Sequence, residues 1–123
     1  VNEMSFDTKE IKTAYRNYLD YIAADYKAWQ NRLAAKGSSG ASAKVLSDMY
    51  MSFVKNLSFK MGNKYVKVFH KNGGVHSFIV NVHDDPKFRF GDILKPASYS
   101  APAKNFARGN IFTTFDRITW TGA

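Results

Sequence analysis

The segment from Lys60 to Lys71 combines lysines with aromatic rings in alternating order. In an extended chain successive side chains point to opposite faces, so valines lie on one face and the aromatic and basic residues on the other. That second face consists of Tyr65, Lys67, Phe69 and Lys71. Rings that stack on bases beside lysines that attract phosphates are the chemistry of a single-stranded nucleic-acid platform. The alternative is that both faces are covered, one by the sheet core and one by helices, with the lysine tips reaching water.

A second cationic segment lies between Gly91 and Phe112. Pro96 and Pro102 bar a central strand there, and a glycine near its end lets a backbone approach a ligand. The segment contributes three cations and one exposed aromatic candidate, namely Lys95, Lys104, Arg108 and Tyr99. Such a loop is suited to clamp a phosphate or a base. The alternative is that Arg108 bonds carbonyl groups within its own loop.

Histidines and aspartates between residues 70 and 85 are possible metal ligands or general bases. His76 and His83 are an odd number of residues apart, so they point to opposite faces of a regular strand. Asp84-Asp85-Pro86 is typical of a turn. His70 and His76 flank a hairpin turn and can meet, but this pair lacks a third ligand. The sequence predicts no metal site, no cofactor and no catalytic residue. A small-molecule enzyme or a nucleotide-sequestering protein built around Arg108 and the histidines is a third, less favoured alternative.

Apolar residues at spacings of three and four predict a helix from Asp7 to Lys36. Asp7 followed by Glu10 resembles a capping box, and Gly37 is the expected stop. Helical spacing resumes from Val45 to Leu57 after a short Gly/Ser turn. We therefore expect a helical hairpin over about residues 7–56. Its first helix carries a stripe of Ile11, Tyr15, Tyr18, Ile22, Tyr26, Trp29 and Leu33.

The period changes to two near Leu57, which predicts strands for the rest of the chain, about residues 57–121. Asn72-Gly73 separates two runs rich in β-branched and aromatic residues, a strong hairpin signal. KFRFGDILK and GNIFTTFDRITW are read as two further strands, with a bend at Gly91-Asp92. Two helices followed by about five mostly antiparallel strands predict an α+β fold in a single domain, residues 1–123.

The composition is that of a globular, basic protein. The chain has 123 residues and a net charge of +8, and it contains no cysteine, which excludes disulfides and cysteine-ligated metals. Ten basic and four acidic residues give net +6 after Asn56, against eight and six, net +2, before it. A basic half suits a polyanionic partner. The sequence shows neither a signal segment nor a membrane span, and we expect no membrane partner and a cytoplasmic location.

Five tyrosines occur in the predicted helices, more than one buried stripe needs, so we expect some near the surface. They are Tyr15, Tyr18, Tyr21, Tyr26 and Tyr50. Tyrosine is favoured in protein interfaces because its ring buries area while its hydroxyl finds a partner. This feature supports an alternative function, a protein-interaction or self-assembly module with a homo-oligomer or a host protein as its partner.

The stretch GDILKPASYSAPAKNFARGNIF and the hairpin KYVKVFHKNGGVHSFIV resemble segments of small uncharacterised bacteriophage-encoded proteins. The resemblance covers the C-terminal half and implies a viral or prophage origin, hence the cytoplasm of a bacterial host. It implies no activity. From the residues we expect a small basic accessory protein that binds single-stranded nucleic acid or a phosphate-bearing ligand through its β half.

Overall fold

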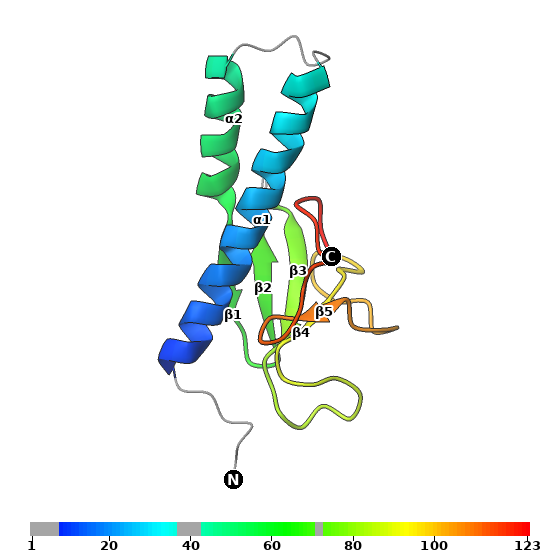
Figure 1. Cartoon of the computed structure of the whole chain (residues 1–123). Helices are drawn as coiled ribbons and strands as arrows, with labels where there is room; N and C mark the ends of the chain where they lie inside the picture. The colour runs from blue at the N-terminus through cyan, green and yellow to red at the C-terminus, as the bar shows by residue number, and fades with distance from the viewer. Residues whose placement is uncertain (1–7, 37–42, 71–72) are drawn as a thin grey trace.

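The computed structural model describes residues 8–36, 43–70 and 73–123. Helices α1 (Thr8–Lys36) and α2 (Ala43–Asn56) run side by side as a hairpin (Figure 1). They are followed by β1 (Ser58–Met61), β2 (Tyr65–Phe69), β3 (Val75–Val80), β4 (Asp92–Leu94) and β5 (Gly109–Asn110). The strands form one antiparallel sheet in sequence order. The predicted α+β fold is confirmed.

Helix α1 forms where the apolar stripe was expected, and the stripe faces the sheet. Tyr15, Tyr18, Ile22 and Tyr26 are buried, and Trp29 packs against the same core. In this core Tyr26 stacks on Phe53 of α2 with ring centroids 4.2 Å apart. The predicted cap at Asp7 and stop at Gly37 lie outside the described residues.

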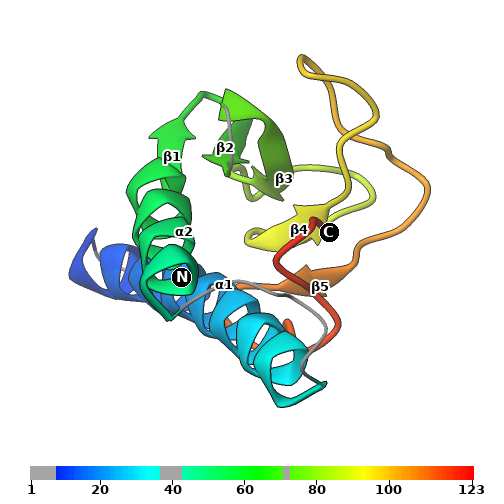
Figure 2. The same ribbon diagram turned by 90° about the horizontal axis from the view of Figure 1, so that it is seen from above.

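The sheet has two different faces. On the helix face, Val66, Val68, Ile79 and Ile93 are buried beneath the helices. On the opposite face, which we call the loop face, Phe78, Val80 and Leu94 form a second, smaller core with Phe88. Figure 2, seen from above, shows the helices on one side of the sheet and the long connections after β3 and β4 on the other. Irregular chain therefore covers the loop face, while the helices cover the other.

Two of the predicted strands are much shorter than expected. KFRFGDILK is a strand only at Asp92–Leu94, because carboxylates bond the backbone before it. Asp85 accepts the amides of Lys87 and Phe88, and Asp92 accepts the amide of Arg89. Side-chain bonds of this kind replace ladder bonds with turns. The bend expected at Gly91-Asp92 is present, with Gly91 at φ 89°.

The last predicted strand, GNIFTTFDRITW, is extended only at Gly109–Asn110. Asn110 stops it, because its side-chain oxygen accepts the amide of Phe112 and its amide group donates to Phe90 O and Asp92 Oδ1. The chain then turns along α1, where Ile111 and Ile118 are buried in the helix-face core. Their apolar spacing thus arises from packing against a helix.

The C-terminal segment joins the two layers. Tyr21 of α1 donates its hydroxyl to Asp116 O, and the amide of Trp120 donates to Asp25 Oδ2. On the sheet side, the amide of Ala123 donates to His76 O. Figure 1 shows this red segment passing beside α1 and β3. No helix in the described part of the chain is long and apolar enough to cross a membrane.

Candidate nucleic-acid interface

An open pocket of about 300 Å³ lies on the loop face at the β1–β2 turn. Three lysines from two strands and the turn surround it, and the half-buried ring of Tyr65 and the buried ring of Phe78 also line it. Its lining residues are Lys60, Met61, Gly62, Asn63, Lys64, Tyr65, Lys67, Phe78 and Ser100. We call this hollow the lysine pocket. Its chemistry is that of an anion site with a surface for stacking.

The central pair of the lysine pocket is Lys60 of β1 and Lys67 of β2, which are direct cross-strand neighbours. Like charges in this arrangement repel and destabilise a sheet. Neither ammonium lies within ion-pairing distance of a carboxylate among the described residues, whereas Lys64 lies 4.0 Å from Asp85. A bound anion between Lys60 and Lys67 would relieve this repulsion.

The turn that carries the pocket is held in place by backbone bonds. Gly62 N donates to Tyr65 O at 3.0 Å, which closes the turn. Asn81 donates two further hydrogen bonds to the turn, from its backbone amide to Lys64 O and from its side-chain amide to Gly62 O. A Cβ at Gly62 would lie 2.6 Å from Tyr65 O, so a side chain there needs the turn to move. These bonds hold Lys64 in the turn beside Lys60 and Lys67 of the strands.

Tyr99, on the long loop after β4, lies beside the pocket, and its neighbour Ser100 lines it. The base of that loop is closed by a bridge between Pro96 and Pro102, and its tip exposes 62% of Tyr99. The Lys67 ammonium lies 4.2 Å from the centre of the Tyr99 ring, and the Phe69 ring is 6.4 Å from it. Tyr65 packs on Phe78. Four sequence-predicted residues therefore meet on the loop face: Tyr65, Lys67, Phe69 and Tyr99.

These residues point away from the helices, as the alternation predicted, but they are not fully exposed. Tyr65, Lys67 and Phe69 are half-buried, because the loops after β3 and β4 lie over the same face. The alternative that both faces are covered agrees in part with the structure, since the helices pack on Val66 and Val68 while loops partly cover the opposite face.

The other predicted cations do not join the lysine pocket. Lys95 and Lys104 are exposed on the loop after β4, and Lys87 donates to Lys104 O. Lys71 lies outside the described residues. The cations predicted from the sequence as one binding surface therefore lie at separate places on the protein.

Arg108 faces its own loop. Its guanidinium carbon lies 3.9 Å from the centre of the Phe106 ring, and Arg108 N donates to Ile93 O. A neighbouring hollow of about 340 Å³ is lined by Ala107 and Gly109 but not by Arg108. The Nε atom of Arg108 is buried without a hydrogen-bond partner among the described residues. The alternative of a loop-internal arginine agrees with this geometry, although Phe106 takes the place of the expected carbonyl groups.

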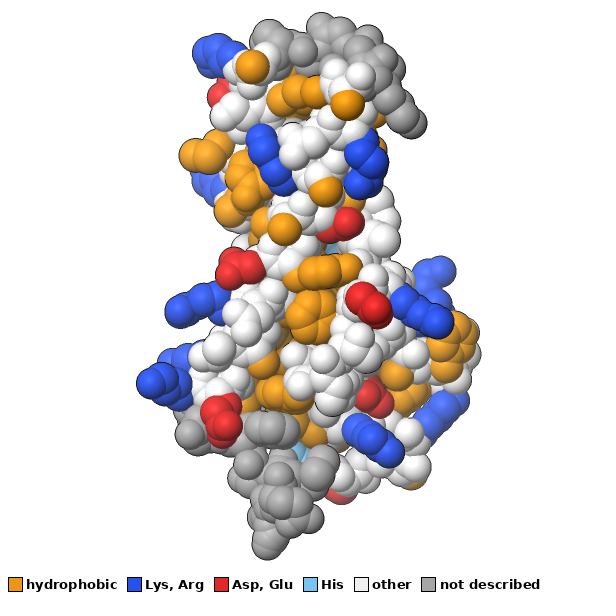
Figure 3. All heavy atoms as spheres, in the orientation of Figure 1, with side chains coloured by type: hydrophobic (Ala, Val, Ile, Leu, Met, Phe, Trp, Pro, Cys, Tyr) orange, Lys and Arg blue, Asp and Glu red, His pale blue; other side chains and the backbone are white. Residues whose placement is uncertain are grey.

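The described residues on the helix side show no comparable concentration of positive charge. In Figure 3, which views that side, basic and acidic side chains are interspersed around a central band of hydrophobic groups. The helix tyrosines are not exposed there. Tyr15, Tyr18 and Tyr26 are buried, and Tyr21 and Tyr50 are half-buried. The expectation that some lie at the surface is met only by these two partly covered rings.

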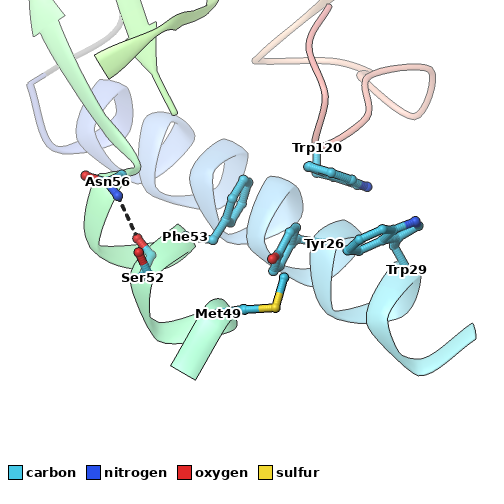
Figure 4. A pocket seen from close by; sticks show the side chains of 7 residues that line it. All are labelled: Tyr26, Trp29, Met49, Ser52, Phe53, Asn56 and Trp120. Carbon is cyan, nitrogen blue, oxygen red and sulfur yellow. Dashed lines mark hydrogen bonds between the residues drawn. The ribbon is translucent and has the colours of Figure 1, made fainter. Parts of the chain in front are cut away.

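A second hollow, of about 400 Å³, opens between the two helices and the C-terminal segment. Figure 4 shows aromatic rings around it, with Met49 and Ser52 on α2. Trp29 and Trp120 lie 4.8 Å apart at its wall. No lysine or arginine lines it; the residues are Tyr26, Trp29, Met49, Ser52, Phe53, Asn56 and Trp120. It lacks the charge that a phosphate needs.

His76 belongs to a buried polar chain, whereas His83 is exposed and stacks on Phe90. His76 Nε2 lies 2.7 Å from Thr119 O, and a carbonyl only accepts, so Nε2 carries the proton. His76 Nδ1 then accepts from Ser77 Oγ, which in turn accepts from the Tyr18 hydroxyl. Burial lowers the pKa of His76 to about 4, which keeps the ring neutral. His70 meets His76 at 5.2 Å between rings, as predicted. No group of three or more metal-ligating side chains occurs within residues 8–36, 43–70 and 73–123.

Comparison with known protein families gives one match, to a family of unknown function (DUF7717), over residues 2–123. The chain belongs to this family. No curated protein and no solved structure matches it. The match spans nearly the whole chain, and the family brings no activity with it.

Sequence reasoning missed Lys60, Lys64 and Phe78 as pocket residues. Lys60 stands between Phe59 and Met61, so the alternation indicates a face opposite to theirs. Its position beside Lys67 depends on the register of β1 and β2, which the two-residue turn Asn63-Lys64 sets. The Gly62-Asn63 break was the available signal for that turn.

Proposed function

We propose that this protein binds single-stranded nucleic acid through the loop face of its sheet, with a phosphate in the lysine pocket and a base on the adjacent aromatic rings. The observation that carries the proposal is the cross-strand pair Lys60–Lys67 beside Tyr65, because neither lysine has a carboxylate within ion-pairing distance among the described residues. Exposed Tyr99, next to Lys67, supplies a further ring. Base stacking on such rings contributes roughly 1–3 kcal/mol per base.

Single strands suit the site better than a duplex. The lysine pocket is compact and lies at one turn, whereas duplex binding uses an element that enters a groove. Unstacked bases also expose ring faces to aromatic side chains. A small phosphate-bearing ligand shares the same phosphate chemistry. A phage origin and a location in the host cytoplasm remain predictions from the sequence.

Titration with fluorescently labelled single-stranded RNA and DNA at several salt concentrations tests the proposal. Lys60→Ala and Lys67→Ala should each weaken binding and reduce the slope of log K against log salt by about 0.7. Lys12→Ala, on the exposed side of α1, is the matched control and should leave the affinity and the salt slope unchanged. Arg108→Ala should have little effect on affinity, because Arg108 is outside the pocket.

A competition experiment distinguishes single-stranded nucleic acid from a small phosphate-bearing ligand. If a free mononucleotide competes with the oligonucleotide at equal phosphate concentration, the pocket is a small-ligand site. Absence of oligonucleotide binding at low salt, or equal losses in the Lys12 and Lys67 variants, would contradict nucleic-acid binding through this pocket.

A further inference from the structure

The free edge of the sheet at β1 presents unpaired backbone groups. Among the residues that the structure describes, β1 is the first strand of the sheet and pairs only with β2. The bond from Gly62 N to Tyr65 O makes residues 62 and 65 a hydrogen-bonded pair. Since such pairs alternate along an antiparallel ladder, Ser58 and Lys60 bond to β2, whereas Phe59 and Met61 direct their N–H and C=O groups outward.

The same edge carries two exposed hydrophobic side chains, Phe59, whose ring stacks on Tyr15 of α1, and Met61. Every residue of β1 is exposed, including 38% of Phe59 and 51% of Met61. Six of the eight large hydrophobic residues that are exposed in the described chain fall within α2 and β1: Val45, Met49, Met51, Val54, Phe59 and Met61. An exposed apolar edge strand is a template for pairing with another chain.

We propose that β1 docks an extended segment of a partner protein whose side chains alternate between apolar and acidic. The added strand would bond to Phe59 and Met61, the arrangement known as β-strand addition. Its apolar side chains would lie on the helix face beside these two residues. Its carboxylates would lie on the loop face beside Lys60, the face on which Lys60 and Lys67 are neighbours.

The positive charge beside β1 favours an acidic peptide at this edge over a second copy of the chain. A second copy of this chain would bring its own Lys60 into a row with Lys60 and Lys67 on one face, and each copy carries net charge +8. Lysine on an edge strand opposes such self-pairing. A nucleic acid offers no ladder of amide groups to the outward backbone of Phe59 and Met61. An acidic extended peptide satisfies both the backbone and the lysines. This inference stands on the strand edge and goes beyond the proposed nucleic-acid function.

Amide hydrogen exchange of the whole protein tests the inference with a short acetylated peptide of alternating valine and glutamate. The amides of Phe59 and Met61 should exchange quickly in the free protein and slowly with the peptide, whereas Lys60 should be protected in both states. Lys60→Glu should weaken peptide binding roughly fivefold, because attraction becomes repulsion. Lys55→Glu, on the exposed side of α2, is the matched control and should change affinity less.

A valine–lysine peptide and a peptide methylated on alternate backbone nitrogens should both fail to protect these amides. Equal binding of the lysine peptide, or no protection of Phe59 and Met61 at saturating peptide, would overturn the proposal. Protection that rises with protein concentration alone would assign the edge to a second copy. Protection by single-stranded RNA would assign it to nucleic acid; each of these two results also overturns it. Salt-dependent RNA binding through Lys67 is measured separately, so one proposal can fail while the other stands.

Discussion

Gly91 shows how one residue fixes the bend that the sequence predicted. Its φ of 89° lies in the region that residues with a side chain rarely adopt. A Cβ at this position would also lie 2.5 Å from Cδ2 of the Phe112 ring. Glycine is therefore required here for two reasons, backbone conformation and the close approach of a ring.

Replacing Gly91 and Gly73 separately distinguishes these two reasons. Gly73 also has positive φ, at 75°, but no described atom lies within 4 Å of its added Cβ. Gly73→Ala should lower the free energy of unfolding by about 1 kcal/mol from backbone strain alone. Gly91→Ala should lower it by about 2–3 kcal/mol, because strain and overlap add. Urea denaturation measures both, and equal effects would show that the Phe112 contact has no energetic consequence.

At the scale of elements, the polar chain between α1, β3 and the C-terminal segment makes stability depend on pH. His76 is buried, and burial lowers its pKa from 6.5 to about 4. Its ring meets Tyr18 of α1 at 6.1 Å and His70 after β2 at 5.2 Å, so no carboxylate is seen compensating a proton there. In the unfolded chain the group binds a proton near pH 6.5, whereas in the folded chain it stays neutral.

Stability should therefore decrease as pH falls from about 6.5 to 4, because the unfolded state binds the extra proton. The full contribution of His76 over this range is about 3 kcal/mol. The His76→Gln variant should have a lower free energy of unfolding than the unmodified protein at pH 7. Between pH 7 and 4, however, its free energy of unfolding should fall by about 3 kcal/mol less than that of the unmodified protein. Denaturation series at several pH values measure this, and parallel declines in both proteins would contradict the role of His76.

The elements that the sequence predicted well are those in which one physical signal dominates. Helix α1 follows its apolar stripe, and β2 and β3 follow their β-branched runs around a turn. Strands β4 and β5 were overestimated, because Asp85, Asp92 and Asn110 bond nearby amides and convert alternating sequence into turns. The site was found in part, since alternation identified the face of Tyr65 and Lys67 but not the neighbour that register places beside Lys67.

At the scale of the whole molecule, the helical layer and the sheet are joined by the C-terminal segment. Ile118 of this segment is buried in the same core as α1 and the sheet. Trp120 contacts rings of both helices, Tyr26 and Phe53. The helices and the sheet should therefore unfold together.

Urea unfolding followed by circular dichroism and by tryptophan emission should give coincident transitions. Deleting residues 116–123 should lower the midpoint for the helices and separate the two signals, because Asp25, His76 and the aromatic rings lose their partners. Deleting only Gly122 and Ala123 is the milder comparison, since it removes the backbone bond to His76 and the bridge between Thr119 and Gly122 but keeps Trp120. An unchanged helix midpoint after the longer deletion would show that the segment does not stabilise the helices.

The contact between Trp29 and Trp120 has a spectroscopic consequence. These are the two tryptophans of the chain, and their ring centres are 4.8 Å apart with planes inclined at 44°. Two identical chromophores fixed at such a distance and angle couple their electronic transitions. The folded protein should thus show a split circular dichroism band from its indoles, and this exciton signal would report directly on whether the end of the chain is docked against the first helix.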